Sequence, residues 1–123
     1  MRTGLVIEDN ENNMVLMTRL LEKAGYRTLW APTGMQGAEM AIKQRPDFII
    51  LDIQLPDIDG MEVLRKIRTS EIGNTIPVIA VTSFAMAGDK ERLLAAGCDE
   101  YIEKPIDPRR VISQLKRVIG EIP

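Results

Sequence analysis

The sequence predicts an α/β fold, a doubly wound, five-stranded parallel sheet flanked by five helices. Short apolar runs alternate with amphipathic stretches five times over 123 residues, with connections of only a few residues. The run at 48–51 is apolar throughout, which is typical of a strand covered on both faces. Strict alternation of this kind favours parallel strands between helical layers. A chain of this size buries about two thirds of its unfolded surface, enough for one core. We therefore expect a single domain over residues 1–123.

The amino-terminal half contains two strand–helix pairs. Residues 5–7 form the first expected strand, and the amphipathic stretch after them ends at Gly25, a common residue at helix C-caps. A weaker strand follows at 28–30. The second helix, at 34–44, ends ahead of Pro46, because proline disfavours a helical conformation in the residue before it.

The carboxyl-terminal half contains three more strands, each followed by a helix. The expected strands are the apolar runs at 48–51, 78–81 and 101–102. The expected helices follow the loop that ends at Gly60, occupy residues 90–96, and begin near Pro108, a residue favoured in a first helical turn.

The composition excludes several function classes. Sixteen Lys and Arg against 18 Asp and Glu give a net charge of −2, which argues against a nucleic-acid-binding module. No apolar run approaches the roughly 18 residues that a membrane span needs, and no signal peptide is recognisable. A single cysteine, Cys98, cannot form an internal disulfide and fits a reducing compartment, so we expect a cytoplasmic protein.

The sequence contains no histidine. This removes the commonest general base, the usual metal ligand and every catalytic triad built on histidine. Chemistry in this chain must use carboxylates, hydroxyls, lysine or a metal bound through oxygen.

Polar residues follow four of the five expected strands. Glu8 and Asp9 follow the first, Asp52 the third, Thr82 the fourth and Lys104 the fifth. The carboxyl ends of parallel strands lie along one edge of a sheet, where ligands of open α/β folds bind. We therefore expect these five side chains to converge on one site.

Three neighbouring carboxylates favour a bound cation. Each close pair repels by a few kcal/mol at a surface-like dielectric, so either a pKa rises or a cation binds. Without histidine the ligands are oxygens, which suits Mg2+ or Mn2+. Asp52, central in the sheet, is the candidate nucleophile for phosphoryl transfer.

These residues resemble the receiver domains of two-component response regulators, over essentially the whole chain. The matching elements are Glu8-Asp9, Asp52 within Leu51-Asp52-Ile53-Gln54-Leu55-Pro56, Gly60, Thr82-Ser83 and Lys104-Pro105. The resemblance implies a flavodoxin-like receiver fold with strand order 2-1-3-4-5.

The resemblance also implies a role for each site residue. Asp52 is expected to accept a phosphoryl group from a phosphohistidine on a sensor histidine kinase or a histidine phosphotransfer protein. Asp9, Asp52 and the main-chain carbonyl of Gln54 are expected to ligate Mg2+, with Glu8 acting through a metal-bound water. Lys104 is expected to pair with the phosphoryl group.

The expected response is a change of protein binding. Thr82 is expected to move toward the phosphoryl oxygens, with Tyr101 following it inward as the coupled aromatic switch. The change would reach a downstream target on the surface formed by the helix at 90–96, the strand at 101–102 and the helix from Pro108. Lys104–Pro105 is expected to be cis, and Phe84 to slow loss of the phosphoryl group.

The expected function is a signalling switch and not an enzyme with an external substrate. One alternative is a receiver segment of a larger hybrid histidine kinase or regulator. Another is an aspartate-nucleophile phosphatase, which needs a second acid two residues after the nucleophile, where this chain has Gln54. A dinucleotide-binding module is rejected, because the turn after the first strand is acidic and lacks glycine.

Other polar and aromatic residues receive structural assignments. Asn10 is expected to cap the first helix. Asp57 and Asp59 are expected to serve the turn in which they lie, and Trp30 to pack on the second strand with no functional role.

Overall fold

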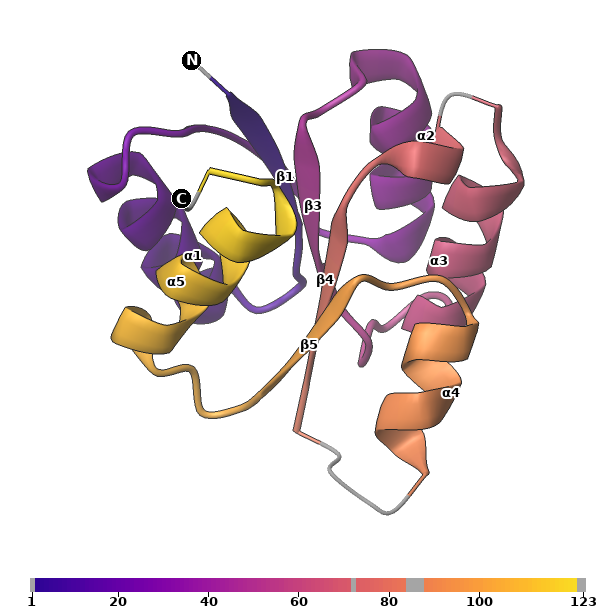
Figure 1. Ribbon diagram of the computed structural model, residues 1–123. Helices are drawn as coiled ribbons and strands as arrows, with labels where there is room; N and C mark the ends of the chain where they lie inside the picture. Colours follow the sequence, from indigo (N-terminus) through magenta and orange to yellow (C-terminus); the bar gives the residue numbers. More distant parts are fainter. Residues whose placement is uncertain (1, 72, 84–87, 122–123) are drawn as a thin grey trace.

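Figure 1 shows a computed structural model of the protein, which describes residues 2–71, 73–83 and 88–121. Phe84, with its expected effect on phosphoryl loss, lies outside the described residues. Five parallel strands form one sheet in the order β2-β1-β3-β4-β5, which confirms the predicted topology. Their bounds are β1 Thr3–Ile7, β2 Arg27–Ala31, β3 Phe48–Asp52, β4 Val78–Thr82 and β5 Glu100–Glu103.

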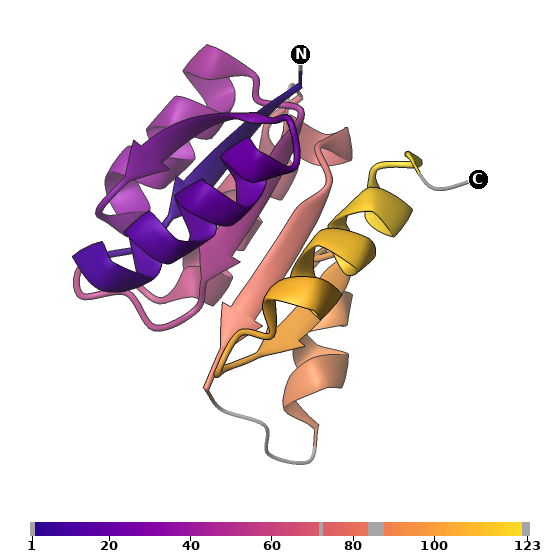
Figure 2. The same cartoon turned by 90° about the vertical axis from the view of Figure 1, so that its left-hand side faces the viewer.

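Helices cover both faces of the sheet. α1 and α5 lie on one face, and α2, α3 and α4 lie on the other (Figure 1); Figure 2 looks onto the face that carries α1 and α5. The helices are α1 Glu11–Lys23, α2 Gly34–Gln44, α3 Gly60–Thr69, α4 Asp89–Ala95 and α5 Pro108–Val118, with a 3-10 turn, η1, at Gly73–Thr75. Among the described residues, no helix combines the length and apolarity needed to cross a bilayer.

The core consists of two apolar layers, one on each side of the sheet. Leu5 and Ile7 of β1 belong to the layer under α2, α3 and α4, while Val6 between them belongs to the layer under α1 and α5. Every residue of β3 and β4 is buried, as the continuous apolar runs predict. Asp52 and Thr82, the last residues of these two strands, are therefore fixed in place by fully packed strands.

Three helix starts are marked by Asn10, Asp59 and Pro108. The sequence predicts Asn10 and Pro108 in this role, whereas it assigns Asp59 only to its turn. The Asn10 side chain accepts a hydrogen bond from the N–H of Asn13 at the start of α1. Asp59 accepts one from the N–H of Met61 at the start of α3. Pro108 occupies the first turn of α5. The caps fix where α1 and α3 leave the carboxyl edge of the sheet.

Asp57 does more than serve its own turn, which corrects the prediction. Its Oδ1 accepts a hydrogen bond from the N–H of Gly34 (2.8 Å) and its Oδ2 one from the N–H of Met35 (2.9 Å). The bond from Met35 is the main reason why the pKa of Asp57 lies below its ordinary value. Asp57 thereby ties the loop after β3 to the amino terminus of α2.

Arg68 of α3 joins three segments at the other end of the sheet. Its side chain is 16% exposed and donates hydrogen bonds to three main-chain carbonyls and one carboxylate. The acceptors are the carbonyls of Gly97 (2.8 Å), Gly73 (2.8 Å) and Ile76 (2.7 Å), and Oδ2 of Asp99 (3.0 Å). This guanidinium replaces the hydrogen bonds that loops around η1 and after α4 would otherwise take from water.

We expect Arg68→Ala to lower the free energy of unfolding by about 2–4 kcal/mol, because it leaves several carbonyls without their charged donor. Arg65→Ala is the matched control on the same helix. Its side chain is 63% exposed and pairs only with Glu62 among the ion pairs described, so we expect a loss within about 0.5 kcal/mol. Urea unfolding followed by circular dichroism measures both variants. Equal losses would contradict the role given to Arg68.

Candidate functional site

Four charged side chains meet at the carboxyl edge of the sheet: Glu8, Asp9, Asp52 and Lys104. One carboxylate oxygen from each of the three acids lies within 4.8 Å of the others. The Lys104 ammonium nitrogen lies 3.4 Å from Oδ2 of Asp52 and 3.6 Å from Oε1 of Glu8. The convergence predicted from the strand ends is confirmed for these four residues.

Burial differs among the four groups. Glu8 is 6% exposed and Asp52 is 3% exposed, whereas Asp9 is exposed to solvent. The Lys104 side chain is 20% exposed and forms ion pairs with both buried acids. Two buried carboxyl groups thus share one ammonium group, so ionisation of both would leave excess negative charge at the edge of the sheet.

The protonation of Glu8 reflects this crowding. Burial, followed by the hydrogen bond to Asp52 and repulsion from its charge, raises the pKa of Glu8 from 4.5 to about 7. Lys104 and the N–H of Asn10 act in the opposite direction but do not cancel the effect. Without further positive charge, Glu8 therefore holds its proton up to neutral pH.

The donor set fits a hard divalent cation. All three acids present oxygen ligands, and two of them already lie in a site where excess negative charge is costly. A divalent cation at the three carboxylates would supply the missing positive charge. Because Asp9 is exposed, a cation bound to it would be accessible to solvent and to an incoming ligand.

The backbone around Asp52 is held by close contacts. The N–H of Gln54 donates to Oδ1 of Asp52 (3.0 Å), and the N–H of Gly60 donates to the carbonyl of Ile53 (3.0 Å). A β-carbon on Gly60 would lie 2.4 Å from the Ile53 α-carbon, so only glycine allows this approach. The loop after β3 is folded back against the site by that contact.

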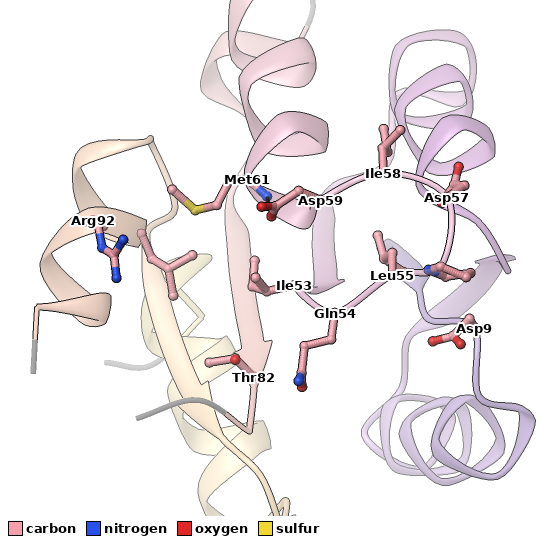
Figure 3. A pocket seen from close by; sticks show the side chains of 12 residues that line it. Asp9, Ile53, Gln54, Leu55, Asp57, Ile58, Asp59, Met61, Thr82 and Arg92 are labelled. Atoms are coloured by element: carbon pink, nitrogen blue, oxygen red, sulfur yellow. Dashed lines mark hydrogen bonds between the residues drawn. The ribbon is translucent and has the colours of Figure 1, made fainter. Parts of the chain in front are cut away.

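A cleft of about 700 Å3 opens beside the charged cluster (Figure 3). In Figure 3, Asp9 lies at one side of the cleft and Arg92 of α4 at the other, with Gln54 and Thr82 between them. Thr82 is 2% exposed. The Gln54 side-chain oxygen accepts hydrogen bonds from the hydroxyl and from the N–H of Ser83 (3.3 Å for the latter), and so links the loops after β3 and β4.

Tyr101 lies within β5, the edge strand next to β4. It pairs with Ala80 across the β4–β5 ladder, and its half-buried ring packs against the core layer under α2, α3 and α4. Lys104 follows β5, and its N–H donates to the carbonyl of Thr82 (2.8 Å). The Lys104–Pro105 peptide bond is cis, as the resemblance implies.

Trp30 contacts the site in a way that the sequence does not predict. Its indole Nε1–H donates to the main-chain carbonyl of Glu8 at 2.7 Å. The β1–β2 register, which pairs Val6 with Trp30, brings the indole beside the end of β1. The one signal available in the sequence is an aromatic residue near the carboxyl end of the weak second strand.

Comparison of the sequence with known proteins identifies a matching family and similar proteins. Residues 5–116 match the response regulator receiver domain family. The chain is 44% identical over 120 residues to the polar-differentiation response regulator DivK of Brucella anthropi, covering 98% of each protein. DivK of Brucella ovis is also 44% identical, with the same coverage.

Solved structures show the same fold. The receiver domain of sensor histidine kinase PA1611 from Pseudomonas aeruginosa PAO1 superposes with a TM-score of 0.89 at 37% identity, covering 97% of this chain and 98% of that one. That structure has a magnesium ion coordinated in its active site cleft. A CheY-like receiver domain protein from Methanospirillum hungatei JF-1 superposes with a TM-score of 0.91 at 28% identity, covering 98% and 95% of the two chains.

We expect the free energy of unfolding, measured with a metal chelator present, to fall by about 2–3 kcal/mol between pH 5 and pH 8. The folded-state pKa of Glu8 lies above its ordinary value. The folded protein therefore keeps a proton that the unfolded chain releases near pH 4.5, and this advantage is lost as the pH rises through 7.

Glu8→Gln should remove most of this slope, because an amide does not titrate. Cys98, whose pKa burial raises from 9.0 to about 11, acts only above this pH range. Urea unfolding at several pH values measures the slope in both proteins. An unchanged slope in Glu8→Gln would contradict the assignment.

Proposed function

The chain belongs to the response regulator receiver domain family, and from that membership we propose that Asp52 is its phosphoryl acceptor. The observation that carries the proposal is the position of Asp52. It is buried at the end of β3, within 4.8 Å of two other carboxylates, and its Oδ2 lies 3.4 Å from the Lys104 ammonium group. A carboxylate so placed meets the charge requirements of phosphoryl transfer, which depends mainly on positioning and charge neutralisation.

The donor in the proposed reaction is a phosphohistidine on a sensor histidine kinase or a histidine phosphotransfer protein. A carboxylate oxygen of Asp52 attacks the phosphorus atom, and a new O–P bond forms as the N–P bond breaks. The electron pair of the broken bond remains with the partner's imidazole. Because this chain has no histidine, the donor must be another protein or another segment.

The proposed cofactor is Mg2+, with Mn2+ as the alternative cation that prefers oxygen ligands. Asp9, Asp52 and the main-chain carbonyl of Gln54 would hold it, and Glu8 would act through a bound water. When bound, the cation neutralises charge on the carboxylates and on the transferred phosphoryl group. Lys104, already paired with Asp52, would contact a phosphoryl oxygen.

Thr82 and Tyr101 are the proposed switch residues. Thr82 ends β4 and faces Glu103 across the β4–β5 ladder, and its carbonyl accepts the N–H of Lys104. A movement of Thr82 toward the phosphoryl group would therefore act directly on β5, the strand that carries Tyr101. Phosphorylation adds about −1.5 to −2 charges and three acceptor oxygens, which supplies the driving force.

The proposed output is binding of a downstream protein at the surface formed by α4, β5 and α5. β5 is an edge strand, and α4 and α5 flank it on opposite faces of the sheet (Figure 1). A change transmitted from Thr82 reaches this surface first. The proposed role is thus a signalling switch in the cytoplasm, where the unpaired and buried Cys98 would stay reduced.

Incubation with Mg2+ and phosphoramidate tests the acceptor. We expect the wild-type chain to gain the mass of one phosphoryl group, because the carboxylate, cation and lysine are all present. Asp52→Asn should gain none. Asp47→Asn is a control, since Asp47 lies at the opposite end of β3 and accepts a hydrogen bond from the N–H of Thr3. A phosphorylated Asp52→Asn chain, or an unreactive wild type, would refute the proposal.

Thr82→Ala tests the switch. We expect this variant to be phosphorylated. It should lose at least about half of the amide chemical-shift changes that phosphorylation induces in β5 and α5, because no hydroxyl at position 82 contacts the phosphoryl group. Thr69→Ala, an exposed threonine on α3, should retain the wild-type shifts. Two-dimensional NMR before and after phosphorylation measures both. Wild-type shifts in Thr82→Ala would rule out the assigned role.

A further inference from the structure

Trp30 makes a specific contact with the acidic site, although the rest of its side chain is not deeply packed. The residue is 39% exposed on β2, an edge strand of the sheet. Its one polar side-chain atom, the indole Nε1–H, donates to the carbonyl of Glu8 at 2.7 Å. The accepting carbonyl belongs to the peptide group that joins Glu8 to Asp9, two acids of the cluster.

The hydrogen bond fixes a peptide plane. The carbonyl of Glu8 and the N–Cα bond of Asp9 belong to one planar unit. Holding that carbonyl therefore sets the direction in which the Asp9 side chain leaves the backbone. Asp9 is the exposed acid of the cluster and lacks the burial that fixes Glu8 and Asp52.

The segment on either side of Asp9 is held as well. The N–H of Glu8 donates to the carbonyl of Ala31 (3.1 Å), which fixes the preceding peptide to β2. After Asp9, the Asn10 side chain caps α1 through the N–H of Asn13. Trp30 supplies the restraint on the peptide between these two anchors.

We propose that Trp30 is a positioning residue of the cation site, which orients the Glu8–Asp9 peptide through its indole N–H so that Asp9 is preorganised as a ligand. The inference rests on the proposed function, since it concerns the same Mg2+ site. Trp30 is neither one of the three acids nor Lys104 or Thr82, so the inference adds a residue to the proposed site.

The test compares variants that remove the N–H. Trp30→Phe keeps an aromatic ring without the donor. A synthetic chain with 3-benzothienylalanine at position 30 keeps the shape of the indole and replaces only the N–H with sulfur. Thr28→Val is the matched control, because it removes a side-chain donor from the same strand. The Thr28 hydroxyl donates to Glu22 and makes no contact with the acidic cluster among the hydrogen bonds described.

Two readouts separate positioning from general stability. Isothermal titration calorimetry with Mg2+ alone should give a dissociation constant about three- to tenfold larger for both Trp30 variants than for the wild type. This is the range expected from one lost hydrogen bond. Phosphorylation by phosphoramidate should need about three- to tenfold more Mg2+ for half-maximal rate, with the rate at saturating Mg2+ within about twofold of wild type. Thr28→Val should match wild type in both.

The outcomes distinguish this inference from the function on which it rests. If both Trp30 variants bind Mg2+ within about twofold of wild type, the positioning role is wrong and the acceptor role of Asp52 stands. A fall in the saturating rate and in the urea midpoint, without a change in Mg2+ affinity, would also overturn the inference. If the wild type neither binds Mg2+ nor accepts phosphate, the proposed function fails and the inference fails with it.

Discussion

The structure depends on one electrostatic constraint, the burial of two carboxylates, Glu8 and Asp52, beside a single lysine. Burial of like charges is costly unless a cation or a proton compensates them. Lys104 compensates in part, at 3.4 and 3.6 Å from the two acids. Burial, followed by the hydrogen bond to Asp52 and repulsion from its charge, raises the pKa of Glu8 to about 7. The charge that Lys104 leaves uncompensated explains why the site suits a divalent cation and, with it, an incoming phosphoryl group.

The fold holds these charges together against their repulsion. Parallel strands bring the ends of β1 and β3 to one edge, and both strands are packed on each face by apolar side chains. The close approach of Gly60 to Ile53 and the bond from Trp30 to the Glu8 carbonyl fix the loops around the acids. The favourable free energy of burying the core thus supports an arrangement that would be unfavourable alone.

Much of this organisation is readable in the sequence, because it rests on local patterns. Apolar runs predict β3 and β4, Asn10 predicts the start of α1 through its capping chemistry, and Pro108 predicts the first turn of α5. Parallel topology then brings Glu8, Asp9, Asp52 and Lys104 together. The contacts of Trp30, Asp57 and Arg68 could not be predicted, because each joins segments whose proximity follows from the packed fold and from no periodic pattern. The 3-10 turn η1 could likewise not be predicted, because three residues are too few to show a hydrophobic periodicity.

The most direct test of the account is chemical trapping of the acceptor. Borohydride reduces an aspartyl acyl phosphate to homoserine, which tandem mass spectrometry can assign to one position. After incubation with phosphoramidate and Mg2+, the account predicts homoserine at position 52, and none when the cation is chelated. Homoserine at position 9, or labelling of Asp52 that is independent of divalent cation, would contradict the claim that the three carboxylates and Lys104 act together on Asp52.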